Sequence, residues 1–219
     1  SLILFVMLFF GGHTIVDTQS ITKDSIKADS IINAAHLQQQ RHDSITDFEL
    51  FMKGLIGQEL TKQKGVEYMK DLKVSTTGIR LILKFETWKH KAYDDGYGYV
   101  TIGVGNRKSN PKPNTTITSE MVWWLFVEDL KDVEKVIDDN VKVPLNQNEY
   151  DALVSFVFNI GSTAFKKSTL LRLLNENKKD AAAKQFERWC MVKGVKSSGL
   201  AKRRQYERQL FAGIEPEIA

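Results

Sequence analysis

Residues 79–105 read IRLILKFETWKHKAYDDGYGYVTIGVG, and this stretch decides what fold the chain can form. In its first half, Ile79, Leu83 and Glu86 follow one another at spacings of four and three, so all three share one face of a helix. Glu86 therefore ends an apolar stripe, at the point where the chain turns outward. A carboxylate in an apolar setting is partly desolvated, which favours the protonated form that a general acid needs.

The second half of the stretch predicts a β-hairpin. Asp95 comes nine positions after Glu86 and directly precedes Gly96 and Gly98, the expected turn. Three apolar residues then alternate on one face, Val100, Ile102 and Val104. Thr101 falls on the opposite face, where its hydroxyl is free to face a cleft. One acid in an apolar setting, one in a polar turn and one hydroxyl between them form a plausible hydrolytic site.

This stretch resembles the phage-type lysozymes, or endolysins. Their signature is Glu, eight residues, Asp, five residues and Thr, within a segment that ends TIGxGH. Glu86, Asp95 and Thr101 match that spacing, and residues 101–105 read TIGVG. The His that closes the signature is replaced by Asn106. This departure leaves open how the hairpin is tied to the other lobe.

The resemblance implies a peptidoglycan hydrolase that cleaves the β-1,4 bond between N-acetylmuramic acid and N-acetylglucosamine, with inversion. Glu86 would be the general acid, Asp95 would stay ionised to orient or deprotonate the attacking water, and Thr101 would hold that water. No metal or organic cofactor is needed. The residues expected to bind substrate are Tyr93, Gly105, Asn106, Arg203 and Arg204.

The resemblance continues over about 140 residues, 77–216, with no large gap. Residues 145–175 and 199–213 look like the family's C-terminal lobe. The implied fold is α+β and mainly helical: a two-lobed lysozyme-like fold with a small β-hairpin lobe, a helical C-terminal lobe and a cleft between them. Strands are expected in the first hairpin alone.

Local signals predict where the helices begin. Thr76 or Thr77 can cap the helix that leads to Glu86, and Thr118 or Ser119 can cap a long helix that ends before Pro144. The long helix has one apolar side. Its other side carries acidic residues that we expect to be solvated, at positions 128, 129, 132, 134, 138 and 139.

Further helices are predicted toward the C-terminus. Asn146 and Glu149 have the spacing of a capping box, and the helix that follows is apolar on nearly every side, which is typical of a central buried helix. Gly161 would end it. The remaining helices are expected at 168–175, 180–191, with Asp180 as N-cap, and 200–212.

Composition excludes several classes of protein. With 219 residues and 42% apolar content the chain can bury one good core, and a net charge of +4 is too low to indicate nucleic-acid binding. The single cysteine, Cys190, reads as a small buried hydrophobe, and the four histidines have no metal-ligand spacing. From Lys166 onward, 13 Lys or Arg face 6 Asp or Glu. That balance suits a polyanionic glycan, although solubilising charge explains it equally well.

The N-terminal third predicts a different role. Residues 2–10 are continuously apolar, so we expect residues 1–16 to be a membrane anchor or a signal segment, with the catalytic domain facing the periplasm or cell wall, or secreted. Residues 17–73 read as a polar tether followed by an amphipathic helix. This helix could pack on the catalytic domain, which is the default, lie on a membrane or meet an assembly partner. The lysozyme-like domain then spans 74–219.

A second function remains open from the sequence. The same fold could serve as a non-catalytic peptidoglycan-binding or structural module of a phage tail or injection machine. An active enzyme could act in lysis, in wall remodelling or in injection.

Overall fold

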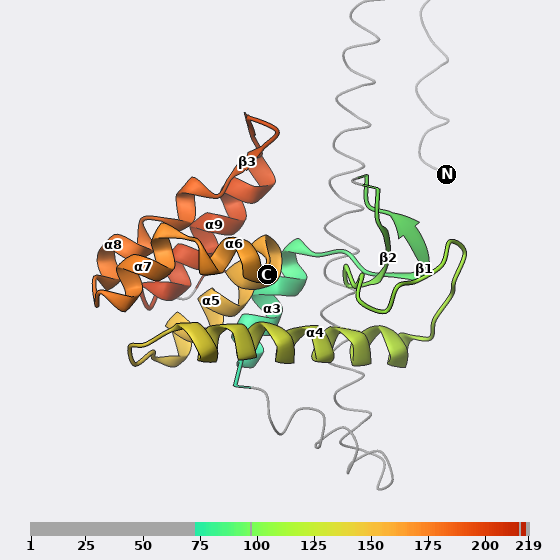
Figure 1. The fold of residues 1–219 in the computed structure, drawn as a ribbon, viewed down its shortest axis with the longest axis horizontal. Helices are drawn as coiled ribbons and strands as arrows, with labels where there is room; N and C mark the ends of the chain where they lie inside the picture. Colours follow the sequence, from blue (N-terminus) through green and yellow to red (C-terminus); the bar gives the residue numbers. More distant parts are fainter. Residues whose placement is uncertain (1–72, 97, 215, 218–219) are drawn as a thin grey trace, which may run out of the picture. The chain divides into compact units, whose positions relative to one another are not determined.

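The computed structural model describes residues 73–96, 98–214 and 216–217, so the predicted anchor and nearly all of the tether lie outside the described residues. Figure 1 shows the arrangement of the helices and strands. In chain order these are α3 (Thr76–Phe85), β1 (Lys89–Asp94), β2 (Val100–Gly103), α4 (Ser119–Asn140), α5 (Gln147–Ile160), α6 (Ser162–Lys166), α7 (Thr169–Asn175), α8 (Lys179–Ala183), η1 (Phe186–Arg188), β3 (Met191–Val192), β4 (Val195–Lys196) and α9 (Ser198–Phe211). In this described part of the chain, no helix is long and apolar enough to span a bilayer.

The N-cap of helix α3 lies one residue before the nearer of the two predicted caps. Ser75 is the N-cap, and its hydroxyl accepts a hydrogen bond from the Thr77 amide at 3.1 Å. The apolar stripe of α3 is buried as predicted. Glu86 is the C-cap residue: its amide donates to the Ile82 carbonyl at 3.0 Å, and its own backbone is already extended. The helix therefore ends just where the carboxylate is presented.

The chain enters this domain through a set of contacts that we call the entry clamp, formed by Lys73–Ser75 with Glu134 and Asp151. The Lys73 and Val74 amides donate to Oε1 of Glu134 at 2.8 and 2.6 Å, and the Ser75 amide donates to Oδ1 of Asp151 at 2.9 Å. Glu134 is only 4% exposed, so the prediction that the acidic side of α4 is solvated is wrong at this position. Burial raises the pKa of Glu134, and the two amide hydrogen bonds oppose that shift.

The predicted hairpin is confirmed as β1 and β2. The strands are antiparallel, with Tyr93 opposite Thr101 and Asp94 opposite Val100. The turn contains two glycines with positive φ, 77° at Gly96 and 86° at Gly98, a region that other residues rarely adopt. The glycine spacing in the sequence therefore predicted this turn for the correct physical reason.

Helix α4 connects the two lobes of the described domain. Thr118 caps it, accepting a hydrogen bond from the Met121 amide at 3.2 Å, which confirms one of the two predicted caps. The helix contacts both strands of the hairpin at one end and α5 and α6 at the other (Figure 1). A space between the lobes is thus bounded by the same long helix that joins them.

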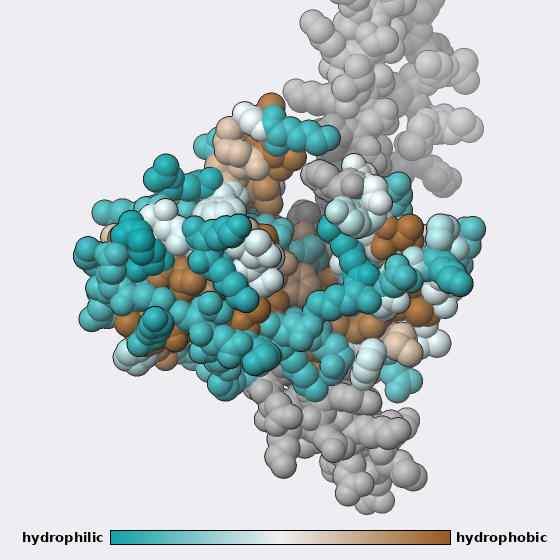
Figure 2. Space-filling model, in the orientation of Figure 1, coloured by the Kyte–Doolittle hydropathy of each residue, from teal (hydrophilic) through white to brown (hydrophobic). Residues whose placement is uncertain are grey.

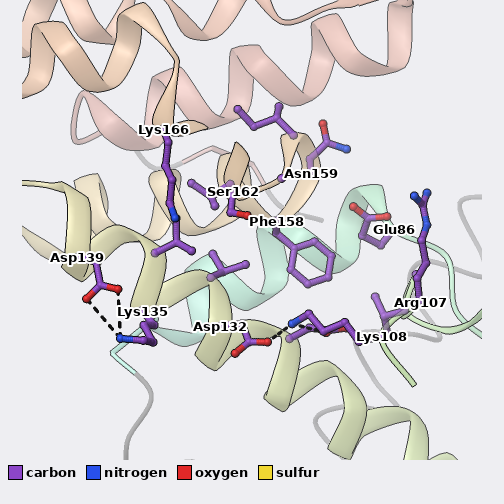
Figure 3. A pocket seen from close by; sticks show the side chains of 18 residues that line it. Glu86, Arg107, Lys108, Asp132, Lys135, Asp139, Phe158, Asn159, Ser162 and Lys166 are labelled. Atoms are coloured by element: carbon purple, nitrogen blue, oxygen red, sulfur yellow. Dashed lines mark hydrogen bonds and ion pairs between the residues drawn. The ribbon is translucent and has the colours of Figure 1, made fainter. Parts of the chain in front are cut away.

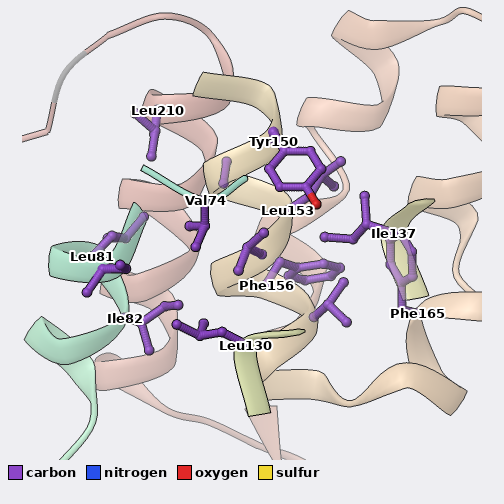
Figure 4. Close-up of a cluster of buried hydrophobic side chains, with 14 of the residues drawn as sticks. Val74, Leu81, Ile82, Leu130, Ile137, Tyr150, Leu153, Phe156, Phe165 and Leu210 are labelled. Carbon is purple, nitrogen blue, oxygen red and sulfur yellow. The ribbon is translucent and has the colours of Figure 1, made fainter. Parts of the chain in front are cut away.

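Helix α5 is the centre of the helical lobe, as its pattern predicted. The capping box is present: the Asn146 side chain accepts from the Glu149 amide at 2.9 Å, and the Glu149 side chain accepts from the Asn146 amide at 2.9 Å. Gly161 ends the helix with a φ of 82°. Figure 4 shows side chains of α3, α4, α6 and α9 gathered around those of α5. Burial of this cluster fixes α3, and with it Glu86, against the helical lobe.

The prediction of one helix over residues 180–191 is wrong. The segment forms the short helix α8, the 3-10 turn η1 and then the strand β3, and Asp180 lies inside α8 instead of capping it. Strands β3 and β4 form a second hairpin, so strands are not confined to the first one. Its turn has positive φ at Lys193 (48°) and Gly194 (81°). Cys190, just before this hairpin, is buried as predicted.

Candidate active site

Glu86 lies on the wall of a cleft between the two lobes. The cleft has a volume of about 770 Å³. Its residues come from α3, the loop after β2, α4, and the region where α5 meets α6 (Figure 3). The surface around it is largely hydrophilic (Figure 2). A cleft of this size and polarity suits a hydrated polymer better than an apolar ligand.

The setting of Glu86 is not apolar, so this part of the sequence interpretation is wrong. Its Oε1 forms an ion pair with Nη1 of Arg203 at 2.5 Å, and its side chain is 23% exposed. Arg203 is 2% exposed. Helical periodicity predicted the burial of the stripe correctly, but it could not predict which residue of α9 would meet the end of α3.

Arg203 is held from a second side by Glu207. Its Nε pairs with Oε1 of Glu207 at 3.1 Å, and its Nη2 donates to the Ser155 carbonyl at 3.1 Å. Burial alone would lower the pKa of Arg203, but the carboxylates of Glu86 and Glu207 outweigh it and raise the pKa. The guanidinium is therefore a fixed cation behind Glu86.

Glu207 is a member of this network that sequence reasoning missed. It is fully buried and also binds Arg204, with Nη1 to Oε2 at 2.5 Å, and it accepts from the Ser155 hydroxyl at 2.8 Å. Burial lowers the pKa of Arg204, against the effect of Glu207. The signal was present as an i, i+3 and i+4 spacing of two Arg and one Glu on α9. We name this set the α9 network: Glu86, Ser155, Arg203, Arg204 and Glu207.

Arg203 and Arg204 were expected to bind substrate. Their side chains are 2% and 0% exposed, and neither lines the cleft. Their placement therefore gives no support to direct contact with substrate. Their burial against Glu207 indicates instead that they hold α9 to its neighbours.

Asp95 stands in the turn of the first hairpin. Its Oδ1 accepts from the Tyr99 amide at 3.2 Å, and its own amide donates to the Tyr99 carbonyl at 3.1 Å. Its Oδ2 forms an ion pair with Nη2 of Arg107 at 2.6 Å. Asp95 is 10% exposed, whereas Arg107 is 51% exposed and lines the cleft. Sequence reasoning did not single out Arg107.

Tyr93 lies within electrostatic reach of both carboxylates. Burial raises the pKa of its hydroxyl, and the charges of Glu86 and Asp95 raise it further. Directly across the hairpin from Tyr93, Thr101 is 2% exposed and its hydroxyl donates to the Tyr99 carbonyl at 3.4 Å. Thr101 therefore does not line the cleft in this structure, although it shares the hairpin with Asp95.

Asn106 ties the hairpin to α4. Its backbone pairs with Ile102, its Nδ2 donates to Oδ2 of Asp129 at 2.9 Å, and its Oδ1 accepts from the Ser109 amide at 3.1 Å. It is 4% exposed, so the expected contact with substrate finds no support in its placement. Its neighbour Gly105, by contrast, does line the cleft. The Asn106 amide thus joins the hairpin to α4 at the position where the signature has His.

Asp129 is the second acidic residue of α4 that is not fully solvated. Burial raises its pKa, while the hydrogen bond from Asn106 and the charge of Lys108 oppose the shift. Nζ of Lys108 lies 3.3 Å from Oδ1 of Asp129 and also pairs with Asp132. The loop after β2 is therefore joined to the middle of α4 through polar contacts.

Known proteins show the same domain. The sequence profile of the phage lysozyme family matches residues 83–207. The endolysin of Salmonella phage P22 is 43% identical over 144 residues, which are 64% of this chain and 98% of that endolysin. The endolysin of Bacillus phage B103 is 39% identical over 142 residues, but the matched part is only 54% of that protein.

Solved structures agree. An endolysin from the Escherichia coli O157:H7 phage FAHEc1 superposes with a TM-score of 0.59 and 34% identity, covering 67% of this chain and 98% of that one. The muramidase domain of SpmX from Asticcacaulis excentricus gives 0.58 and 34%, covering 63% and 96%. The described domain is a lysozyme-like α+β fold, mainly helical. This chain belongs to the phage lysozyme family, and as such it is a lysozyme-type hydrolase of peptidoglycan.

Proposed function

We propose that the chain is a muramidase that cleaves the β-1,4 bond between N-acetylmuramic acid and N-acetylglucosamine. Glu86 protonates the leaving oxygen, Asp95 orients or deprotonates the attacking water, and Thr101 holds that water. The observation that carries this proposal is the placement of Glu86. Its carboxylate lies on the cleft wall, where the end of α3 presents it and the buried guanidinium of Arg203 on α9 pairs with it.

The ion pair with Arg203 imposes a condition on the acid role. An opposite charge favours the carboxylate, whereas loss of water favours the protonated acid. Bound glycan would cover the cleft wall and remove water from Glu86, whose side chain is 23% exposed without it. In this proposal Glu86 therefore acts as the acid only when glycan fills the cleft. Arg203, neutralised on its other side by Glu207, keeps the carboxyl group oriented.

The test is Glu86→Gln, assayed on purified peptidoglycan. The amide has the same shape and can still accept the Arg203 hydrogen bond, but it has no proton to donate. We expect turnover to fall to a few per cent or less, with folding and glycan binding retained. Glu176→Gln is the matched control, because Glu176 lies on the surface in pairs with Arg172 and Lys178. A Glu86→Gln protein with more activity than that would refute the assignment.

The bond specificity needs its own measurement. Borohydride reduction of the products labels the new reducing end before acid hydrolysis. A muramidase gives reduced muramic acid, whereas cleavage of the other glycosidic bond gives reduced glucosamine. Recovery of reduced glucosamine alone would contradict the proposed bond while leaving hydrolase activity intact.

The non-catalytic alternative is favoured by one observation. Both candidate carboxylates are neutralised by arginine in this structure, as they would be in a structural module. Peptidoglycan that binds the protein but releases no soluble fragments would establish this alternative.

We also propose that residues 1–16 hold the enzyme at a membrane, with the catalytic domain on the cell-wall side. The support is the sequence: nine consecutive apolar residues, 2–10, are costly to expose to water. The full chain should sediment with membranes. A shortened chain that begins at Thr18 should be soluble and active on peptidoglycan. Two soluble forms, or a shortened chain that fails to fold, would contradict the anchor.

A further inference from the structure

The ion pair between Arg107 and Asp95 has no counterpart in the signature that led to the site. Arg107 directly follows Asn106, and Nη2 of its guanidinium lies 2.6 Å from Oδ2 of Asp95. The guanidinium also lies over the ring of Tyr99, with Cζ 4.8 Å from the ring centroid. The arginine thus reaches from the cleft wall to the proposed water-activating carboxylate.

This contact covers one of the two oxygens that a water could use. Oδ1 of Asp95 accepts the Tyr99 amide and Oδ2 faces the guanidinium, so a water that approaches Oδ2 meets Arg107 there. Arg107 competes for it, and a paired guanidinium also makes a carboxylate a weaker base. The free protein therefore holds Asp95 in a state that is less suited to the reaction.

The Arg107 side chain can leave Asp95 without a change in the main chain. The main chain around Arg107 is fixed, because Asn106 pairs with Ile102 and the Arg107 carbonyl accepts from the Asn110 amide at 3.0 Å. The side chain itself is half exposed. Because the guanidinium is half exposed, an anion that enters the cleft can reach it and compete with Asp95 for it. Such an exchange requires the guanidinium to move but not the loop.

The cleft has the chemistry to attract such an anion. Lys108, Lys135 and Lys166 line it together with Arg107 (Figure 3). Lys108 is paired with Asp132 and Lys135 with Asp139, both aspartates of α4. A guanidinium binds a carboxylate through two parallel hydrogen bonds, which an ammonium group cannot do.

We propose that Arg107 is a specificity-determining residue that selects glycan bearing carboxylates. On binding, it exchanges Asp95 for a carboxylate of the glycan or its attached peptide, and Oδ2 of Asp95 is released to the water. Substrate charge thereby switches on the base. This inference rests on the proposed hydrolysis and on the role given there to Asp95.

The test compares peptidoglycan with the same material after its carboxylates are converted to neutral amides with carbodiimide and ammonia. For the wild-type protein we expect kcat/KM to be about tenfold or more higher on the unmodified material. Arg107→Met should reduce this preference to about one, mainly by losing activity on the carboxylate form. Arg107→Lys should restore only part of it, because the fork is absent. The preference is a ratio, so a general loss of stability would not change it.

Lys135→Met is the matched control, because it removes a positive charge from the same cleft but away from Asp95. If it abolished the preference as fully as Arg107→Met, the selection would come from the general field of the cleft and the proposal would be overturned. A wild-type protein that is active but shows no preference would also overturn it, leaving the proposed function intact. A wild-type protein that releases no reducing ends from either material would refute both.

Discussion

The two carboxylates of the candidate site each face an arginine, but their surroundings differ. The partner of Glu86, Arg203, is buried on α9 and held from behind by Glu207. The partner of Asp95, Arg107, is half exposed on a loop and has one ion pair among the described residues. The first pair is part of a network that spans three helices, whereas the second joins a hairpin to its own exit loop. In the proposed exchange, Glu86 keeps its arginine while Asp95 gives its arginine up.

The largest effect expected from this comparison concerns stability. Arg203→Met leaves Glu207 buried without one of its two cations, so we expect the free energy of unfolding to fall by about 3–5 kcal/mol. Arg107→Met removes a guanidinium that is half exposed and should cost less, about 1 kcal/mol. Urea unfolding of both variants gives the comparison directly. Equal losses would show that the two pairs do not differ as described.

The next effect concerns the two polar residues of the hairpin. Asp95→Ala should lower kcat about 100-fold or more, because a charged group that orients or deprotonates water is lost. Thr101→Ala should cost less, since it removes one hydrogen bond to a positioned water, about 1–3 kcal/mol. Turbidity clearance of peptidoglycan suspensions measures both. A larger loss for Thr101→Ala would reverse the roles proposed for these residues.

The smallest effect tests the contact between hairpin and α4. Asn106→His places an imidazole beside Asp129, whose charge should raise the pKa of the imidazole above its ordinary value. The variant should then gain about 1 kcal/mol of stability below pH 6.5, and this gain should vanish as the pH rises through the raised pKa. Urea unfolding between pH 5 and 9 checks the sign.

In wild-type protein a linkage of the same sign applies at Asp129. Because burial raises the pKa of Asp129, its charge costs stability as the pH rises above the ordinary value of 3.8.

The chemical step should change little in Asn106→His. A large rise in turnover with unchanged stability would show that the missing His matters for catalysis.

Much of this site could be predicted from local sequence. Glu86, Asp95 and Thr101 belong to one short stretch, and glycines specify the turn between its strands through positive φ. The capping box of α5 likewise lies within four consecutive positions, 146–149. Such features depend on neighbours in the chain, so a single sequence suffices to find them.

The parts that could not be predicted depend on contacts between distant segments. Arg203 meets Glu86 across 117 positions of sequence, and Glu134 is buried because two amides 60 and 61 positions away require an acceptor. From the sequence alone, an acidic helix face is predicted to be solvated, because its distant partners are not known. The break after α8 was missed for a related reason: the second hairpin depends on a positive φ at Lys193, which its residue type does not suggest.

The entry clamp has a mechanical consequence. Hydrogen bonds from three consecutive amides to side chains of α4 and α5 fix the direction in which the chain leaves the domain at Lys73. Tension applied to the preceding residues would be carried by these hydrogen bonds in parallel and passed to α4 and α5. The hairpin with Asp95 would carry none of it directly. A pull on the chain would therefore reach α4 and α5 before it reached the hairpin that carries Asp95.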